Sequence, residues 1–327
     1  MAHWLIIKEG LRLNHFLEER MFLVVASGLL LGAVFHNQVV FLKPAIPYMF
    51  AYITFVMALG CNSADFKNAL KSPGLTLAML SLLHIVMPII ALALTKSFLP
   101  GEPLLQAGII LGTAVPIGVS SIIWVGLAGG NVALALTTVI ADTILSPLVT
   151  PATLLLTIGR LVHFNLAQLM TGLCWMIVVP TIIGMLVHDF SKGQVNRGWR
   201  FFNGPATKIL MALVIATNLA VAWDSLHLLK AALPIITVLV FIMGCSGYLL
   251  GYGAGKLGKL SPANVNTFIF TVGMRNITAG LVMALQYFAE LTAIPVVFAI
   301  LFQQPLAVVS HRFLVAKNTN TNVHSNK

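Results

Sequence analysis

The chain has 327 residues, of which 58% are hydrophobic and only 9% are charged, and its mean hydropathy is +0.95. Soluble domains carry about 25% charged residues, so this composition excludes a soluble domain and predicts an all-α polytopic membrane protein surrounded by lipid. The net charge of +10 at pH 7 does not indicate nucleic-acid binding, because the basic residues cluster in short loops, as cytoplasmic loops do. No nucleic-acid or protein partner is expected.

The N-terminal segment, residues 1–20, predicts an amphipathic helix at the membrane interface rather than a signal peptide. Glu9, Glu18 and Glu19 stand among its basic residues, and no small-residue cleavage site follows a short apolar core. Apolar stretches long enough to cross a bilayer follow it. We predict ten such spans, near residues 21–41, 45–61, 73–98, 104–129, 131–158, 166–188, 205–223, 228–252, 262–287 and 291–315.

The orientation of these spans follows from lysine and arginine, most of which fall in segments on the same side as the N-terminus. The protein is therefore expected in the inner membrane of a cell, with both termini in the cytoplasm. We divide the chain into residues 1–188, which hold a first five-helix repeat and the span that opens a second, a cytoplasmic linker at 189–204, and the rest of an inverted second repeat at 205–316. The polar residues 317–327 predict a disordered tail.

Two of the spans, 104–129 and 262–287, are interrupted by helix-breaking residues at 112–118 and at 272–276. Free backbone groups inside a membrane are tolerated only where they face a cavity or buried protein. Matched broken spans in inverted halves indicate the binding site of a secondary transporter. We expect the two spans to cross, with Pro116, Gly118 and Gly273 in the unwound backbone.

Two ionisable residues lie deep in predicted spans, Asp142 in 131–158 and Arg275 in the second break. Burial of such groups is costly unless they are paired. A structural ion pair is one interpretation. In the other, the planar fork of Arg275 binds an anionic substrate, while Asp142 competes for it and carries a proton, with Thr138 and Thr271 as further coupling residues.

Uncharged polar residues supply further candidates for the substrate site, each with a structural alternative. Hydroxyl residues often line helix contacts in membranes, an amide at a break can satisfy free backbone groups, and the proline after Gln304 can simply kink its helix. His84 is expected to be a helix-contact histidine. The candidates are Ser120, Ser121, Asn276, Gln303 and Gln304. The three cysteines show no metal-ligand spacing, and no motif of a membrane enzyme is present, so neither a metal nor catalysis is expected.

Several segments resemble the bacterial branch of the bile acid/sodium symporter family, within the bile/arsenite/riboflavin transporter superfamily. They are Gly130-Asn131-Val132-Ala133-Leu134, the run 146–151, Val272-Gly273-Met274-Arg275-Asn276, and the run 61–66. The resemblance implies a core that contains two crossing broken helices and a panel formed by spans one, two, six and seven. It also implies alternating access and substrates that are amphipathic or small organic anions, such as bile acids and pantoate-like carboxylates.

The chain departs from the family at positions where the resemblance implies oxygen ligands for sodium. Apolar residues stand at Ile122, Ala135 and Val139, while Thr271 replaces a glutamate and Arg275 a glutamine. A cation beside Arg275 would be repelled, so sodium coupling is expected to be lost or altered, with a proton as a candidate coupling ion and no cofactor. Residues 104–129 contain no cysteine, which disfavours arsenite transport.

The resulting prediction is a secondary active transporter of an organic anion. The alternatives are a sodium-coupled symporter with a rearranged ion site, and a non-transporting membrane sensor that keeps the same fold.

Overall fold

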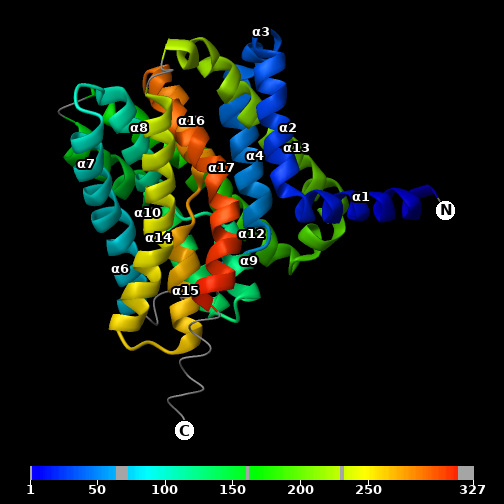
Figure 1. The fold of residues 1–327 in the computed structure, drawn as a ribbon. Helices are drawn as coiled ribbons and strands as arrows, with labels where there is room; N and C mark the ends of the chain where they lie inside the picture. Colours follow the sequence, from blue (N-terminus) through cyan, green and yellow to red (C-terminus); the bar gives the residue numbers. More distant parts are fainter. Residues whose placement is uncertain (1, 64–72, 160–161, 229–231, 316–327) are drawn as a thin grey trace. The chain divides into compact units, whose positions relative to one another are not determined.

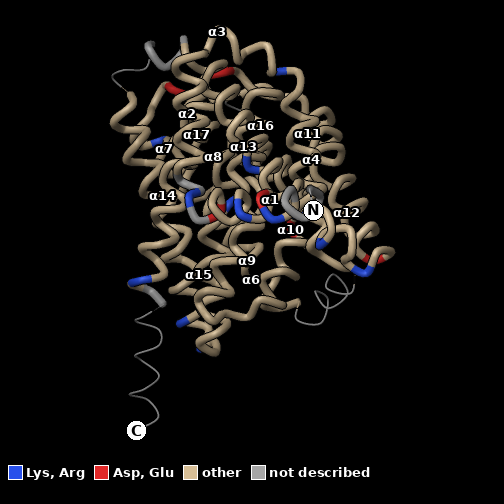
Figure 2. The backbone as a smooth tube through the Cα atoms, turned by 90° about the vertical axis from the view of Figure 1, so that its right-hand side faces the viewer, with Lys and Arg blue, Asp and Glu red and all other residues tan. Residues whose placement is uncertain are grey.

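The computed structural model describes residues 2–63, 73–159, 162–228 and 232–315 (Figure 1). These residues are helical or connect helices, and within them the β-structure is limited to one isolated bridge. Among the described residues, seven helices are long and apolar enough to cross a membrane, and three shorter apolar helices lie at Leu23–Val34, Pro103–Ala114 and Ile277–Tyr287. Figure 2 shows long stretches of backbone without a charged position. The protein is therefore an all-helical, multi-pass membrane protein.

The contacts divide the chain into two compact units. Unit 1 comprises Met1–Ser63 and Thr171–Leu228, and unit 2 comprises Ala64–Met170 and Leu229–Lys327. Unit 1 therefore holds the first, second, sixth and seventh predicted spans, which is the grouping that the family resemblance implies for the panel. The predicted tail at 317–327 and part of the run 61–66 lie outside the described residues.

Unit 1 is built from a helix that begins the chain and from helices of the first and middle thirds. They are α1 (Ala2–Glu19), α2 (Met21–Val34), α3 (His36–Val39), α4 (Ile46–Ala58), the end of α11 (Leu166–Leu173), α12 (Val179–Ser191) and α13 (Gln194–Leu228). A buried lysine of α13 joins α1 to this unit, because the ammonium group of Lys208 donates to Asn14 Oδ1 at 2.7 Å and to Glu18 Oε1 at 3.4 Å.

Most of the predicted cytoplasmic linker at 189–204 is helical. Helix α12 continues to Ser191 and α13 begins at Gln194, so Lys192 and Gly193 alone make the turn, with φ of 50° and 74°. A left-handed glycine after a helix is a common way to end it. The polar and basic composition of 194–204 belongs to the first turns of a long helix, which polarity alone does not distinguish from a loop.

Unit 2 holds the two interrupted spans and the helices packed around them. They are α6 (Pro73–Ser81), a π-helical turn (Leu82–Val86), α7 (Met87–Phe98), α8 (Pro103–Ala114), α9 (Ser120–Leu127), α10 (Val132–Ile158), α14 (Leu233–Leu257), α15 (Pro262–Gly273), α16 (Ile277–Tyr287) and α17 (Ala293–Ser310).

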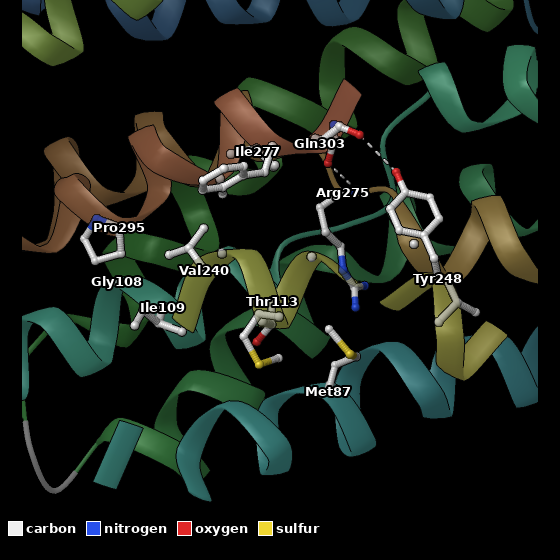
Figure 3. Close-up of a pocket in the computed structure, with 17 residues that line it drawn as sticks. Met87, Gly108, Ile109, Thr113, Val240, Tyr248, Arg275, Ile277, Pro295 and Gln303 are labelled. Atoms are coloured by element: carbon white, nitrogen blue, oxygen red, sulfur yellow. Dashed lines mark hydrogen bonds between the residues drawn. The ribbon is translucent and has the colours of Figure 1, made fainter. Parts of the chain in front are cut away.

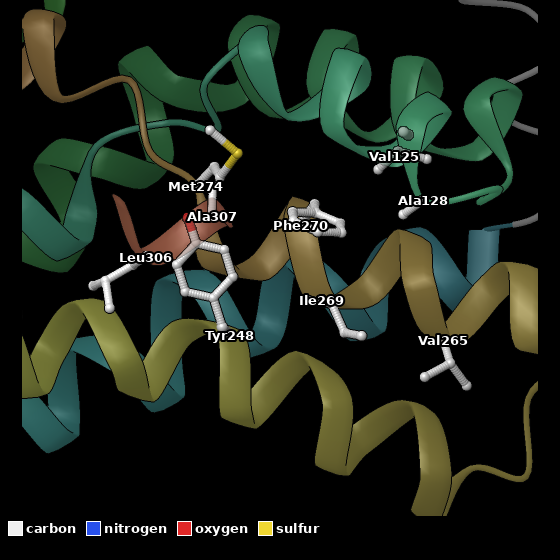
Figure 4. Close-up of a cluster of buried hydrophobic side chains, with 10 residues drawn as sticks. Val125, Ala128, Tyr248, Val265, Ile269, Phe270, Met274, Leu306 and Ala307 are labelled. Carbon is white, nitrogen blue, oxygen red and sulfur yellow. The ribbon is translucent and has the colours of Figure 1, made fainter. Parts of the chain in front are cut away.

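Part of the core of unit 2 is an aromatic and aliphatic cluster beside the second interruption (Figure 4). Tyr248 of α14 and Phe270 of α15 meet edge to face with ring centroids 6.2 Å apart, and Met274 is fully buried in the same cluster. Edge-to-face contacts of this kind add to the stabilisation from buried area. This packing holds the end of α15 against α14, where the helix stops.

Candidate functional site

Both predicted interruptions are present in unit 2. Helix α8 ends at Ala114 and α9 begins at Ser120, while α15 ends at Gly273 and α16 begins at Ile277. The first residue past α8, Val115, is extended, and so is Met274 past α15. The two spans are therefore interrupted near Pro116 and Gly273, as the sequence predicts.

The two breaks satisfy each other's free backbone groups. The amide of Asn276 donates to the carbonyl of Pro116 at 2.7 Å, and the amide of Gly118 donates to the carbonyl of Met274 at 3.2 Å. Together they form the isolated antiparallel bridge between Ile117 and Arg275. Because backbone groups inside a membrane need internal partners, the two interruptions stabilise one another.

Two glycines allow this close approach. A Cβ on Gly118 would lie 2.7 Å from the carbonyl oxygen of Arg275, and one on Gly273 would lie 2.3 Å from the ring of Tyr248. Real Cβ atoms essentially never come so near to a neighbour. Both positions that the sequence placed in the crossover therefore require the absence of a side chain.

Asp142 bonds to the first break rather than to Arg275. Its Oδ2 accepts the backbone amide of Ile117 at 2.6 Å, and its Oδ1 lies 2.6 Å from Nε2 of His84. The direct ion pair between Asp142 and Arg275, one of the two interpretations of these charges, is therefore not formed. The physical reason is the free amide that the break creates, which competes for the carboxylate together with a histidine on a neighbouring helix.

His84 lies in the π-helical turn before α7 and bonds across helices, as expected for a helix-contact histidine. Its ring meets Asp142 of α10, and its carbonyl accepts the hydroxyl of Thr153 at 3.3 Å. Four residues later, Pro88 has no N–H to donate to that carbonyl. The Thr153 hydroxyl gives that carbonyl a donor from α10, which ties α10 to the irregular turn.

Arg275 borders a small cavity of unit 2 (Figure 3). Only 6% of the residue is exposed, and neither Nη1 nor Nη2 has a hydrogen-bond partner in the described part of the chain. The carboxylate of Asp142 bonds to Ile117 and His84 instead of to the guanidinium. Arg275 therefore presents a buried cation with free donors to the cavity.

The remaining cavity wall is mostly apolar. It includes Met87, Ile109, Val240, Met243 and Phe302. A few polar groups fix its geometry, since Gln303 accepts the backbone amide of Arg275 at 2.9 Å through Oε1, and the hydroxyl of Tyr248 donates to the carbonyl of Gln303 at 3.1 Å. An apolar cavity with a few convergent polar groups is the usual form of a small-molecule site.

Other predicted site residues make structural contacts. Asn276 caps α16 by accepting the amide of Ala279 at 3.2 Å, and Gln304 accepts from the indole of Trp124 at 3.3 Å. The hydroxyl of Thr138 donates to the carbonyl of Leu134 at 2.9 Å. Their roles in substrate binding or coupling stay predictions.

Ser121 and Thr271 are fully buried, and their hydroxyls have no partner among the described residues. Ser120 is half-buried at the start of α9. None of these three borders the cavity around Arg275. The described residues also contain no group of three or more His, Cys, Asp or Glu side chains placed to hold a metal ion.

The sequence reasoning missed the two aromatic walls of the cavity, Tyr248 and Phe302. Both stand in continuous apolar spans, where aromatic residues ordinarily pack against neighbours. The available signal was indirect, because Gly244 and Gly247 beside Tyr248 indicate a face that another backbone approaches closely. A carbon on Gly247 would lie 3.0 Å from the carbonyl oxygen of Val272.

Comparisons with known proteins identify a matching family and several relatives. The model of the Sodium Bile acid symporter family matches residues 47–229. The chain is 35% identical to the "Uncharacterized protein YbaS" of Bacillus subtilis over 290 residues, which covers 88% of this chain and 94% of that protein. It is 27% identical to the "Uncharacterized sodium-dependent transporter YocS" of the same organism, over 87% of each chain. It is also 26% identical to the "Probable sodium/metabolite cotransporter BASS1, chloroplastic" of Arabidopsis thaliana, over 83% of this chain and 67% of that one.

Proposed function

The chain belongs to the Sodium Bile acid symporter family, and from that premise we propose that it is a secondary active transporter of a small or amphipathic organic anion. Two broken spans with joined interruptions are typical of the binding region of such carriers. The substrate would bind in the cavity of unit 2 and cross the membrane by alternating access.

The observation that carries the anion assignment is the state of Arg275. Its guanidinium is buried, borders the cavity, and has two nitrogens without hydrogen-bond partners in the described chain. A buried cation of this kind is stabilised by an anion with two acceptor oxygens, which a carboxylate provides in matching geometry. The apolar wall formed by residues such as Met243 and Phe302 suits the hydrocarbon part of the same molecule.

The architecture in this proposal has ten spans in two inverted five-helix repeats, with both termini in the cytoplasm and the protein in the bacterial inner membrane. Seven long helices and three shorter apolar ones support that number. The shorter helices are those expected of an interrupted or bent span, since α8 and α16 each end or begin at a break. The excess of lysine and arginine on one side supports the orientation.

Sodium coupling in this proposal is lost or altered. The side chains of Ile122, Ala135 and Val139 offer no oxygen to a cation. Arg275 lies in the second break, where its positive charge repels a cation. A sodium-coupled symporter with a rearranged site is the second candidate. Two relatives favour this candidate, because one is named a sodium-dependent transporter and the other a probable sodium/metabolite cotransporter.

A thermal-unfolding screen of the purified full-length protein tests both candidates. Cholate and pantoate serve as anionic probes, and the methyl ester of cholate serves as the matched uncharged control. A ligand that binds only the folded state raises its stability by mass action, so at a concentration about 100-fold above Kd the gain is about 2.7 kcal/mol. We expect stabilisation by at least one anion, little by the ester, and the same shifts when choline replaces sodium.

Three outcomes separate the candidates. Stabilisation that requires sodium would support the sodium-coupled symporter. Equal effects of cholate and its ester would contradict an anion site at Arg275. Binding without uptake of the labelled anion into proteoliposomes would favour a sensor over a carrier.

A further inference from the structure

The buried charges of unit 2 balance. Within its described residues, Asp142 and Arg275 are the buried residues that carry a full charge, with 0% and 6% of their surfaces exposed, and His84 is a third buried titratable group at 7%. With His84 neutral, the carboxylate and the guanidinium sum to zero. An anion that binds at Arg275 makes this sum negative, and an uncompensated charge is costly in such a place.

The hydrogen bonds of Asp142 show where a compensating proton can bind. An ionised carboxylate only accepts hydrogen bonds. Its Oδ2 accepts the amide of Ile117, so its Oδ1 requires a proton on the Nε2 of His84 that lies 2.6 Å away. In neutral imidazole the other nitrogen then carries a lone pair. That atom, Nδ1 of His84, is buried without a partner in the described part of the structure.

We propose that His84 is the proton-binding site of a proton–carboxylate symporter, in which one proton on its Nδ1 accompanies each carboxylate bound at Arg275. The inference deepens the proposed function and rests on it. A hydronium ion on one side gives up the proton: its O–H bond breaks as the N–H bond to Nδ1 forms, and water is left behind. The proton returns to water on the other side after the anion leaves. The imidazolium and the carboxylate bring +1 and −1, so the loaded site has the same net charge as the empty one.

The other titratable groups around His84 do not take its place. The elements packed against its turn are α6, α7, α8, α10 and α14. Of these, α6 and α8 carry no titratable side chain, α7 carries Lys96 near its end, and α10 carries Asp142. On α14, Tyr248 donates to Gln303, and the remaining groups are Cys245, Tyr252 and Lys256. Among the described residues, Asp142 is the one titratable group in hydrogen-bond contact with His84.

A short chain of contacts joins the proton site to the anion site. His84 contacts Asp142, Asp142 accepts the amide of Ile117, and Ile117 pairs with Arg275 in the antiparallel bridge between the two breaks. Protonation of His84 changes the charge next to the carboxylate that holds the first break. The charge state of His84 is therefore linked to the backbone that positions Arg275.

The test measures proton uptake when an anion binds to the full-length protein in weakly buffered detergent solution with a pH-sensitive dye. Cholate and pantoate are used separately at a pH where both are fully ionised. We expect the solution to become more alkaline by up to about one proton per anion bound. The affinity should rise about tenfold for each unit that the pH falls while His84 is neutral in the free protein.

Variants assign the proton to its site. His84→Gln keeps an amide that can donate to Asp142 but cannot titrate, so it should bind anion without proton uptake and with an affinity independent of pH. His163→Gln removes an exposed histidine of the same unit and should behave as the unchanged protein. In proteoliposomes, uptake should follow an inward proton gradient and should not change when potassium and valinomycin set the membrane potential.

Each outcome bears on the inference. Anion binding without proton uptake in the unchanged protein would overturn it and would leave the anion site intact. Proton uptake that persists in folded His84→Gln would also overturn it. If neither probe binds, the anion site at Arg275 fails, and this inference fails with it. If His84→Gln does not fold, the stoichiometry and the voltage independence of the unchanged protein decide the question.

Discussion

The backbone amide of Asn276 donates to the carbonyl of Pro116 at 2.7 Å, although 159 positions separate the two residues in the sequence. The bond joins the interruption of the second broken span to that of the first. Each break leaves backbone groups that the membrane interior cannot solvate. The crossover is therefore one structural unit in which neither interruption is satisfied without the other.

A side chain at Gly118 should disturb this unit. The Cβ of Gly118→Ala would lie 2.7 Å from the carbonyl oxygen of Arg275, and backbone cannot move away as a flexible side chain can. We expect a loss of about 1–3 kcal/mol in the free energy of unfolding, together with weaker anion binding. Thermal and denaturant unfolding in detergent would measure the loss.

Gly253→Ala is the matched control for that change. Gly253 lies in α14 and has no atom within 4 Å of the position of a Cβ. Alanine favours a helix over glycine, so this variant should be as stable as the unchanged protein or slightly more so. Equal stability of the two alanine variants would show that the breaks do not approach as closely as described.

Replacement of Asp142 should destabilise the first break, and alanine should do so more than asparagine. Asp142→Asn keeps one oxygen that can accept the amide of Ile117, whereas Asp142→Ala leaves that amide and the ring of His84 without a partner. A buried donor left unsatisfied costs about 1–3 kcal/mol. The order of unfolding free energies should be unchanged protein, then Asn, then Ala. An alanine variant as stable as the unchanged protein would mean that Asp142 does not hold the break.

The hydroxyl of Thr153 should matter more than that of its neighbour one turn away. Thr153 donates to the carbonyl of His84 on another helix, whereas Thr157 donates back to the carbonyl of Thr153 in its own helix. We expect Thr153→Val to lose about 1 kcal/mol of stability and Thr157→Val to lose much less. Chemical unfolding of both variants checks the difference, and a larger loss for Thr157→Val would contradict it.

The positions of the breaks could be predicted from the sequence. Proline and glycine weaken helices, but α10 continues through Pro147 and Pro151, so the matched placement of the two interruptions in the chain was the stronger signal. The partners of the freed groups depend on which segments meet in three dimensions. The bond from Ile117 to Asp142 is of that kind, and this is why the ion pair with Arg275 was expected and is absent.

The roles of polar residues were less predictable than their positions. Asn276 was a candidate for substrate binding, yet its side chain accepts the amide of Ala279 and caps α16. The first amides of a helix have no partner within the helix, and the side chain of Asn276 satisfies one of them at the start of α16. Arg275 stands one residue earlier, and its side chain has no such use, so it remains available to a ligand.

The central claim is that Arg275 binds an organic anion, and the affinity of variants at this position tests it most directly. Binding of cholate and pantoate would be measured by calorimetry on the unchanged protein, Arg275→Lys and Arg275→Gln, with folding checked by thermal unfolding. A charged, hydrogen-bonded contact of this kind contributes about 1.5–3 kcal/mol, so Arg275→Gln should bind at least about tenfold more weakly, and Arg275→Lys should lie between the two. An Arg275→Gln variant that is folded and binds both anions with unchanged affinity would contradict the account.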